Sequence, residues 1–183
     1  MESQTERASA FPRGLPAMQR VELSDEMANA ALLVHKLALD RRSQNIGLEE
    51  YFAGIYLAHR EALVPFWDNP WRLDVFVREC CGVGEPSWWH WVDFYMWSKR
   101  NARRAPTLIP YSPPLSAVLD DAANLALERQ RKAARRPKLE VGHVVRALVR
   151  HPEFDFTRAA LRSGMKGPSP RGSGARSRTA GTR

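Results

Sequence analysis

Apolar residues recur along this chain at steps of three and four, the period of an α-helix that buries one face. After Leu23 they fall at Met27, Ala30, Ala31, Val34, Leu37 and Ala38, and after Leu115 at Val118, Leu119, Ala122, Leu125 and Ala126. Ser24 and Ser112 precede these two series, where a helix N-cap is expected. No stretch alternates apolar and polar residues as a half-buried strand does. The pattern therefore predicts an all-α fold.

Five shorter helices are predicted at residues 49–59, 70–80, 87–103, 142–150 and 154–162. The two ends of the chain have a different character, with few large apolar residues among Gly, Ser, Pro and Arg. Such segments bury too little surface to offset the entropy lost on ordering. We therefore expect residues 1–20 and the basic tail 165–183 to be disordered around a folded body at 21–164.

The composition of the 183 residues, 44% hydrophobic and 26% charged, is typical of one soluble domain. No apolar run is long enough to span a membrane, and the first twenty residues lack the apolar core of a secretory signal. The two cysteines are adjacent, so a disulfide framework is excluded. We expect a cytoplasmic protein. The net charge of +8 is concentrated in the tail, where residues 163–183 hold five basic side chains and no acidic one.

An internal repeat organises the body, since residues 23–58 can be aligned with residues 111–152. Each segment begins with Leu23 or Tyr111 followed by a serine. It continues with a long amphipathic helix, a polar turn, a glycine-containing elbow and a second apolar helix. The offset is 88 residues from Leu23 to Tyr111 and 93 residues from Ile46 to Leu139, because the second polar turn is longer. Each half would cover the apolar face of the other.

These two units resemble the double Clp-repeat domain at the N-terminus of Clp-family AAA+ unfoldases. The resemblance rests on Leu23-Ser24 and Tyr111-Ser112-Pro113 at the openings, and on Asn45-Ile46-Gly47-Leu48-Glu49-Glu50 and Glu140-Val141-Gly142-His143 at the elbows. It implies two pseudo-symmetric four-helix Clp repeats packed as one domain. Repeat one would span about 23–82, a linker helix 87–104, and repeat two about 111–164.

Several positions depart from the family pattern. The elbow Thr is replaced by Leu48 and Val141, and the elbow Glu is kept as Glu49 but replaced by Gly142 in the second unit. No phosphate-binding P-loop, nucleophile elbow or paired catalytic carboxylate is present in the sequence. We therefore expect a free-standing, non-enzymatic recognition domain that needs no cofactor.

The resemblance implies a ligand site at the openings and elbows. In family members that bind phosphorylated arginine, the opening hydroxyl contacts the phosphate and the elbow Glu contacts the guanidinium. Ser24 and Glu49 form the corresponding pair here, and Ser112 alone remains in the second unit because Gly142 replaces its Glu. The alternative is structural, since Ser24 would cap its helix and Glu49 would complement a helix dipole.

The segment at residues 87–97 holds four of the six tryptophans. On a helix Trp88, Trp91 and Tyr95 share one face, and the remaining aromatic residues lie largely elsewhere. Such a helix either packs between the repeats or presents aromatic anchors to a partner helix or peptide, and the proposed anchors are Trp89, Phe94 and Trp97.

Two basic clusters, at residues 129–138 and at Lys99, Arg100, Arg103 and Arg104, are either solvated helix ends or phosphate contacts. The five histidines show no zinc-ligand spacing, so no metal site is predicted.

The favoured hypothesis is a domain that binds a peptide, adaptor or substrate in protein quality control, with a Clp-type ATPase as a possible partner. One alternative is a binder of the sheath helix of type VI secretion, because the second elbow resembles the N-domain of the sheath-recycling ATPase. Another alternative is a basic nucleic-acid-associated protein.

Overall fold

The computed structural model describes residues 17–101, 109–129 and 136–166. Within these ranges the chain is mostly helical, which confirms the predicted all-α class. The α-helices are α1 (Asp25–Asp40), α2 (Leu48–Leu63), α3 (Pro70–Phe76), α4 (Trp88–Asn101), α5 (Pro113–Arg129), α6 (Val141–Val149) and α7 (Asp155–Arg162). Two 3-10 turns, η1 (Ala17–Arg20) and η2 (Val64–Phe66), and a π-helical turn, η3 (Val77–Cys81), complete the helical elements. Each of the five shorter helices begins within one residue of its predicted start.

The two long helices begin at the predicted serine caps. The Ser24 hydroxyl accepts a hydrogen bond from the Met27 amide at 3.3 Å, and the Ser112 hydroxyl accepts one from the Leu115 amide at 3.4 Å. Each bond satisfies one of the amides that a helix leaves unpaired in its first turn.

Short extended segments also pair with one another, which the sequence did not predict. β1 (Glu22–Leu23) runs parallel to β2 (Lys138–Leu139), and the Ser24 amide donates to the Leu139 carbonyl at 3.0 Å. A second parallel bridge joins Ile46 to Tyr111, and there the Ser112 amide donates to the Ile46 carbonyl at 2.9 Å. Segments of two residues are too short to show an alternating pattern.

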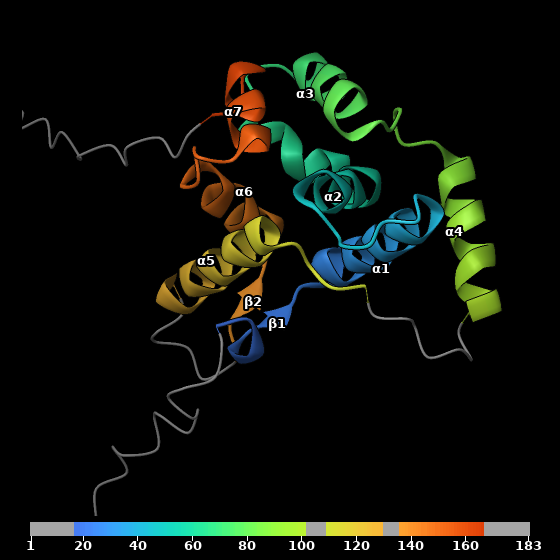
Figure 1. The fold of residues 1–183 in the computed structure, drawn as a ribbon, viewed down its shortest axis with the longest axis horizontal. Helices are drawn as coiled ribbons and strands as arrows, with labels where there is room; N and C mark the ends of the chain where they lie inside the picture. The colour runs from blue at the N-terminus through green and yellow to red at the C-terminus, as the bar shows by residue number, and fades with distance from the viewer. Residues whose placement is uncertain (1–16, 102–108, 130–135, 167–183) are drawn as a thin grey trace, which may run out of the picture.

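The two pairings join positions that the alignment of the two segments makes equivalent. Leu23 aligns with Tyr111 and Ile46 aligns with Leu139, so exchanging the segments turns one pairing into the other. Helix α1 packs on α2, α5 packs on α6, and α2 also contacts α6 (Figure 1). Each pair of helices therefore closes one side of a shared core.

A cluster of aromatic rings connects α2 to α3 and α7. Phe76 lies 5.8 Å from Trp67 and 5.3 Å from Phe156, measured between ring centroids, and Phe52 contacts all three rings. Trp67 also forms an antiparallel bridge with Met165. Figure 1 places α3 and α7 together at the end of the molecule away from β1 and β2.

An ion pair fixes α3 against α2. The Arg60 guanidinium donates two hydrogen bonds of 2.7 Å to the Asp74 carboxylate, and the Tyr56 hydroxyl donates a third at 2.8 Å. The Arg60 bonds hold the pKa of Asp74 below its usual value. The link therefore stabilises the fold above the ordinary carboxyl pKa range and is lost as the pH falls through the lowered pKa.

The ordered body extends beyond its predicted limits at both ends. Ala17–Arg20 forms a turn that packs on α5, so the predicted disordered segment 1–20 is wrong over these residues. The predicted tail 165–183 is likewise wrong at Met165, which is buried against the core. Residues 1–16 and 167–183 lie outside the described ranges. The described part of the predicted second repeat holds three α-helices, α5 to α7.

Gly54 marks the closest approach of α1 and α2. A Cβ at this position would lie 2.9 Å from the Val34 backbone nitrogen and would overlap the Val34 side chain. We expect Gly54→Ala to lower the free energy of unfolding by about 1–3 kcal/mol, because the two helices must move apart, despite the better helix propensity of Ala. Urea unfolding measures the loss.

Gly84→Ala is the matched control, since nothing lies within 4 Å of a Cβ at Gly84. Equal stability of the two variants would contradict the close packing of α1 on α2.

Candidate functional site

The two serines of the predicted ligand site lie beside the elbows of the opposite halves. We call residues 45–50 the first elbow and residues 138–143 the second elbow. Ser24 is bonded through its amide to Leu139 in the second elbow, and Ser112 is bonded in the same way to Ile46 in the first elbow. Each helix start therefore faces the elbow that leads into the second helix of the other half.

Ser24 and Glu49, the predicted pair, are not brought together. Glu49 follows Leu48 at the start of α2, where the neighbouring Glu50 lies 3.7 Å from Arg41 at the far end of α1. Ser24 caps the opposite end of that 16-residue helix, a distance of about 24 Å at 1.5 Å per residue. The pairing was wrong because it assumed that a serine and the elbow of its own half form one site.

The first elbow assigns different roles to its two adjacent glutamates. The Glu50 carboxylate accepts hydrogen bonds from the Gly47 amide at 2.9 Å and from the Ser43 hydroxyl at 3.3 Å. Glu49 is exposed and has no hydrogen bond or ion pair within the part of the chain that the structure describes. Glu50 is therefore a capping residue, and the Glu49 carboxylate is available to a ligand.

The second elbow repeats this cap with different side chains. The Glu140 amide donates to Nδ1 of the buried His143 at 3.2 Å, so His143 takes the role of Glu50. Gly142 occupies the position of Glu49, as the sequence indicated. Glu140, which stands where the first elbow has Gly47, supplies an exposed carboxylate here instead.

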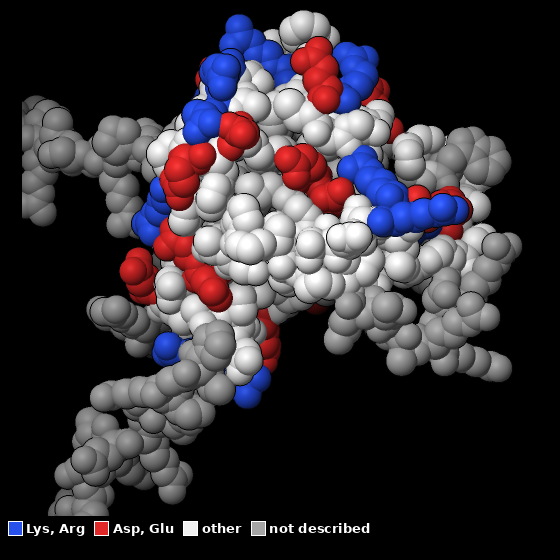
Figure 2. Space-filling view, viewed as in Figure 1, with Lys and Arg blue, Asp and Glu red and all other residues white. Residues whose placement is uncertain are grey.

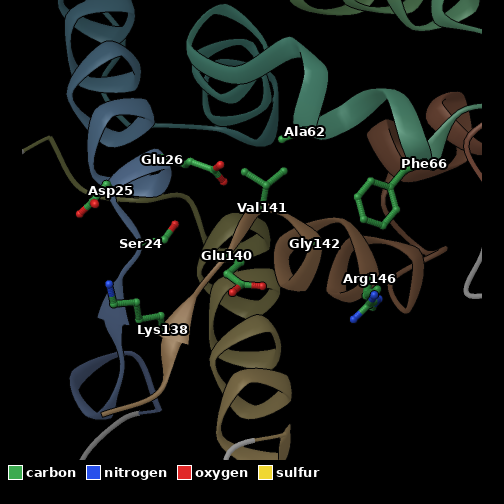
Figure 3. A pocket seen from close by; sticks show the side chains of 10 residues that line it. All are labelled: Ser24, Asp25, Glu26, Ala62, Phe66, Lys138, Glu140, Val141, Gly142 and Arg146. Atoms are coloured by element: carbon green, nitrogen blue, oxygen red, sulfur yellow. The ribbon is translucent and has the colours of Figure 1, made fainter. Parts of the chain in front are cut away.

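An open pocket of about 570 Å³ lies between Ser24 and the second elbow (Figure 3). Its lining comes from three parts of the chain, namely the start of α1 (Ser24, Asp25, Glu26), the end of α2 with η2 (Ala62, Phe66), and the second elbow with α6 (Lys138, Glu140, Val141, Gly142, Arg146). We call this the α1–α6 pocket.

The α1–α6 pocket combines charge of both signs with an apolar wall. Three carboxylates, on Asp25, Glu26 and Glu140, outnumber the two cations of Lys138 and Arg146. Phe66 and Val141 supply the apolar part of the lining. The pocket therefore suits a segment of chain that carries a cationic side chain next to an apolar one.

None of the five charged residues of this pocket was in the predicted ligand set of Ser24, Glu49 and Ser112. The alignment of the two halves identified residues 140–143 as an elbow, but it compared like positions and gave no information on contacts between the halves. Lys138, Glu140 and Arg146 become neighbours of Ser24 only through the pairing of β1 with β2.

The aromatic side chains of helix α4 that the structure describes differ in exposure. Trp88, Trp91 and Tyr95 are exposed, whereas Phe94 is partly buried against the core and Trp97 stacks on it with ring centroids 6.1 Å apart. Phe94 therefore packs on the core, and Trp97 packs on Phe94 while staying partly exposed. The structure does not describe the side chain of Trp89.

The two basic clusters lie mostly outside the described residues, which leave out 102–108 and 130–135 and the side chains of Arg100 and Arg129. Within the described ranges, Lys99 sits 5.3 Å from the centre of the Tyr95 ring. No group of three His, Cys, Asp or Glu residues in those ranges could hold a metal ion. None of the helices described is both long and apolar enough to cross a membrane.

Comparisons of the chain with protein-family models and with curated proteins find no match.

The two glutamates of the first elbow give a direct test of their separate roles. We expect Glu50→Ala to lower the free energy of unfolding by about 0.5–2 kcal/mol, because the Gly47 amide loses its cap. The adjacent Glu49→Ala should change it by less than about 0.5 kcal/mol, since the side chain is exposed. Urea unfolding of the two variants measures the difference, and a reversed order would contradict the assignment.

A comparison of two variants of α4 distinguishes an aromatic residue that packs on the core from one that is exposed. Phe94→Ala should cost about 1–3 kcal/mol of unfolding free energy, because it removes a ring that packs against the core. Trp88→Ala should cost much less, since 62% of the Trp88 surface is exposed. Thermal and urea unfolding report both. Equal losses would show that Trp88 also holds α4 in place.

Proposed function

We propose that this protein is a non-enzymatic protein-binding domain that takes an extended peptide segment with a cationic side chain into the α1–α6 pocket. One observation carries the proposal. The capped start of α1 and the second elbow, more than a hundred residues apart in the chain, line one open pocket with acidic groups beside an apolar wall.

The charges of the pocket favour a mixed ligand. Asp25 and Glu26 stand in the first turn of α1, where they offset the partial positive charge of its free amides. The Glu140 carboxylate is then the acceptor for an incoming guanidinium or ammonium group, while Phe66 gives an apolar neighbour to contact. Lys138 and Arg146 would contact carboxylate or phosphate groups of the same ligand.

The Clp-repeat arrangement is part of the proposal. The equivalent pairings of Ser24 with Leu139 and of Ser112 with Ile46 support two related helical units. In that arrangement each ligand site combines the serine of one repeat with the elbow of the other. Glu49 would then form one ligand site with Ser112. Glu140 would supply the carboxylate of the other site, beside Ser24, in place of the one missing at Gly142.

The partners remain those that the resemblance implies. A domain of this kind would present a substrate or adaptor segment to a Clp-type ATPase, or bind the sheath helix of type VI secretion. The exposed Glu140 supports a segment with basic residues in either case.

Binding of a fluorescein-labelled peptide, GSLRFLRSG, tests the proposed function by fluorescence anisotropy with the full chain. We expect Glu140→Lys to weaken this binding about tenfold, because a cation then faces the arginines of the peptide. Glu26→Lys should weaken it in the same direction from the other wall of the pocket.

Glu85→Lys is the charge-matched control, since Glu85 is exposed and lies outside the pocket lining. Circular dichroism of each variant establishes that it is folded. Unchanged affinity of both pocket variants would overturn the site. Binding of a DNA duplex that weakens steeply with salt, without peptide binding, would favour the nucleic-acid alternative.

A further inference from the structure

A second hollow lies at the other end of the molecule, between α3 and α7. It has a volume of about 500 Å³ and is lined by Trp71, Arg72, Val75, Phe76, Glu79, Cys80, Ala159, Arg162 and Ser163. We call it the α3–α7 groove. None of its residues lines the α1–α6 pocket, so the two sites can be tested separately.

The base of the groove is apolar and packs against the core. Phe76 is buried and touches Phe156 of α7 with ring centroids 5.3 Å apart. The Trp67 indole donates to the Ser163 hydroxyl at 3.2 Å, which ties the groove wall to the aromatic core. The hollow is therefore held by the core of the protein and does not depend on a loop.

Trp71 stands at the edge of the groove with 66% of its surface exposed. The start of α3 explains this position. The Asn69 side chain accepts a hydrogen bond from the Trp71 amide at 2.9 Å, and Pro70 occupies the first helical position. A capped first turn fixes the backbone of Trp71 and leaves its indole at the surface, where aromatic residues contribute strongly to protein interfaces.

The charges on the rim are mainly positive. Arg72 and Arg162 form no ion pair with any residue that the structure describes, and Glu79 is the acidic residue of the lining. The Arg72 side chain lies over Gly164, whose φ of +103° favours glycine; a Cβ there would lie 3.2 Å from Cδ of Arg72 and 3.4 Å from the Asp68 carboxylate. Arg72 is thereby positioned from α3 toward the end of α7. Figure 2 shows basic side chains gathered over this end of the molecule among fewer acidic ones.

We propose that the α3–α7 groove is a docking site for an acidic peptide segment of a partner protein, with one large apolar side chain between carboxylates. The apolar side chain packs on Trp71, Val75 and Ala159. The flanking carboxylates pair with Arg72 and Arg162. Neither guanidinium forms an ion pair in the described part of the chain, and the Arg162 Nε that donates to the Arg158 carbonyl at 3.3 Å leaves its two terminal nitrogens for a ligand. The site is additional to the α1–α6 pocket and has the opposite charge preference.

A fluorescein-labelled peptide, GSLEFLESG, is the probe, and anisotropy with the full chain gives its affinity. We expect Trp71→Ala, and separately Arg72→Glu, to weaken its binding about tenfold or more. Trp88→Ala and Arg78→Glu are the matched controls, because Trp88 is almost as exposed as Trp71 and Arg78 lies on the neighbouring turn outside the groove. Neither control should change the affinity.

The two cysteines locate the bound peptide. Cys80 lines the groove and is exposed, whereas Cys81 is buried. Partial desolvation raises the pKa of the Cys80 thiol, and the rate of its alkylation can be followed by mass spectrometry. The acidic peptide should slow alkylation of Cys80 severalfold, and the basic peptide GSLRFLRSG should not.

Three results would overturn the proposal. The first is equal affinity for the acidic peptide in Trp71→Ala, in Arg72→Glu and in the unchanged chain. The second is no protection of Cys80 when the peptide is saturating. The third is equally strong competition by a single-stranded DNA of the same charge. The Glu140→Lys variant changes the α1–α6 pocket and leaves the α3–α7 groove intact. It should therefore still bind the acidic peptide, so failure of the pocket and failure of the groove give different results.

Discussion

The backbone hydrogen bond from Ser24 to Leu139, with its counterpart from Ser112 to Ile46, is the constraint on which the rest of the structure depends. Each bond lies one residue before a long helix and holds that helix start against the elbow of the other half. Helix α1 packs closely on α2, with Val34 against Gly54, and has no comparably extensive contact with α6 in the described residues. The pairing of β1 with β2 sets the position of the start of α1 relative to α6. The α1–α6 pocket lies between these two elements and depends on this pairing.

The sequence predicts local structure well here because the signals for helices are local. Ser24, Ser112 and the spacing of apolar residues lie within one helix each, and the structure follows them closely. The pairing of β1 with β2 joins residues far apart in the chain through backbone groups, which every residue carries. No side-chain pattern distinguishes such a segment, and the predicted partner of Ser24 was therefore placed in the wrong half.

The local geometry of the two elbows decides which site residues can be recognised from the sequence. Glu49 and Glu50 look alike in the sequence, and only the geometry of the first elbow separates the capping carboxylate from the exposed one. In the second elbow His143 is the capping residue. The exposed carboxylate of this elbow belongs to Glu140, whereas Gly142 stands at the position equivalent to Glu49. A comparison of aligned positions reports this as a lost acidic residue, although the pocket keeps its acidic character.

The two sites depend on one short stretch of chain. Phe66 lines the α1–α6 pocket, and its neighbour Trp67 packs on Phe76 beneath the α3–α7 groove. The Lys166 amide donates to the Phe66 carbonyl at 2.8 Å, and the Asp68 amide donates to the Gly164 carbonyl at 3.0 Å. These bonds clamp the stretch between the two hollows against the end of α7. Because packed cores resist small displacements, residues on the rims can be changed without disturbing this stretch, whereas a change in Trp67 would alter both sites at once.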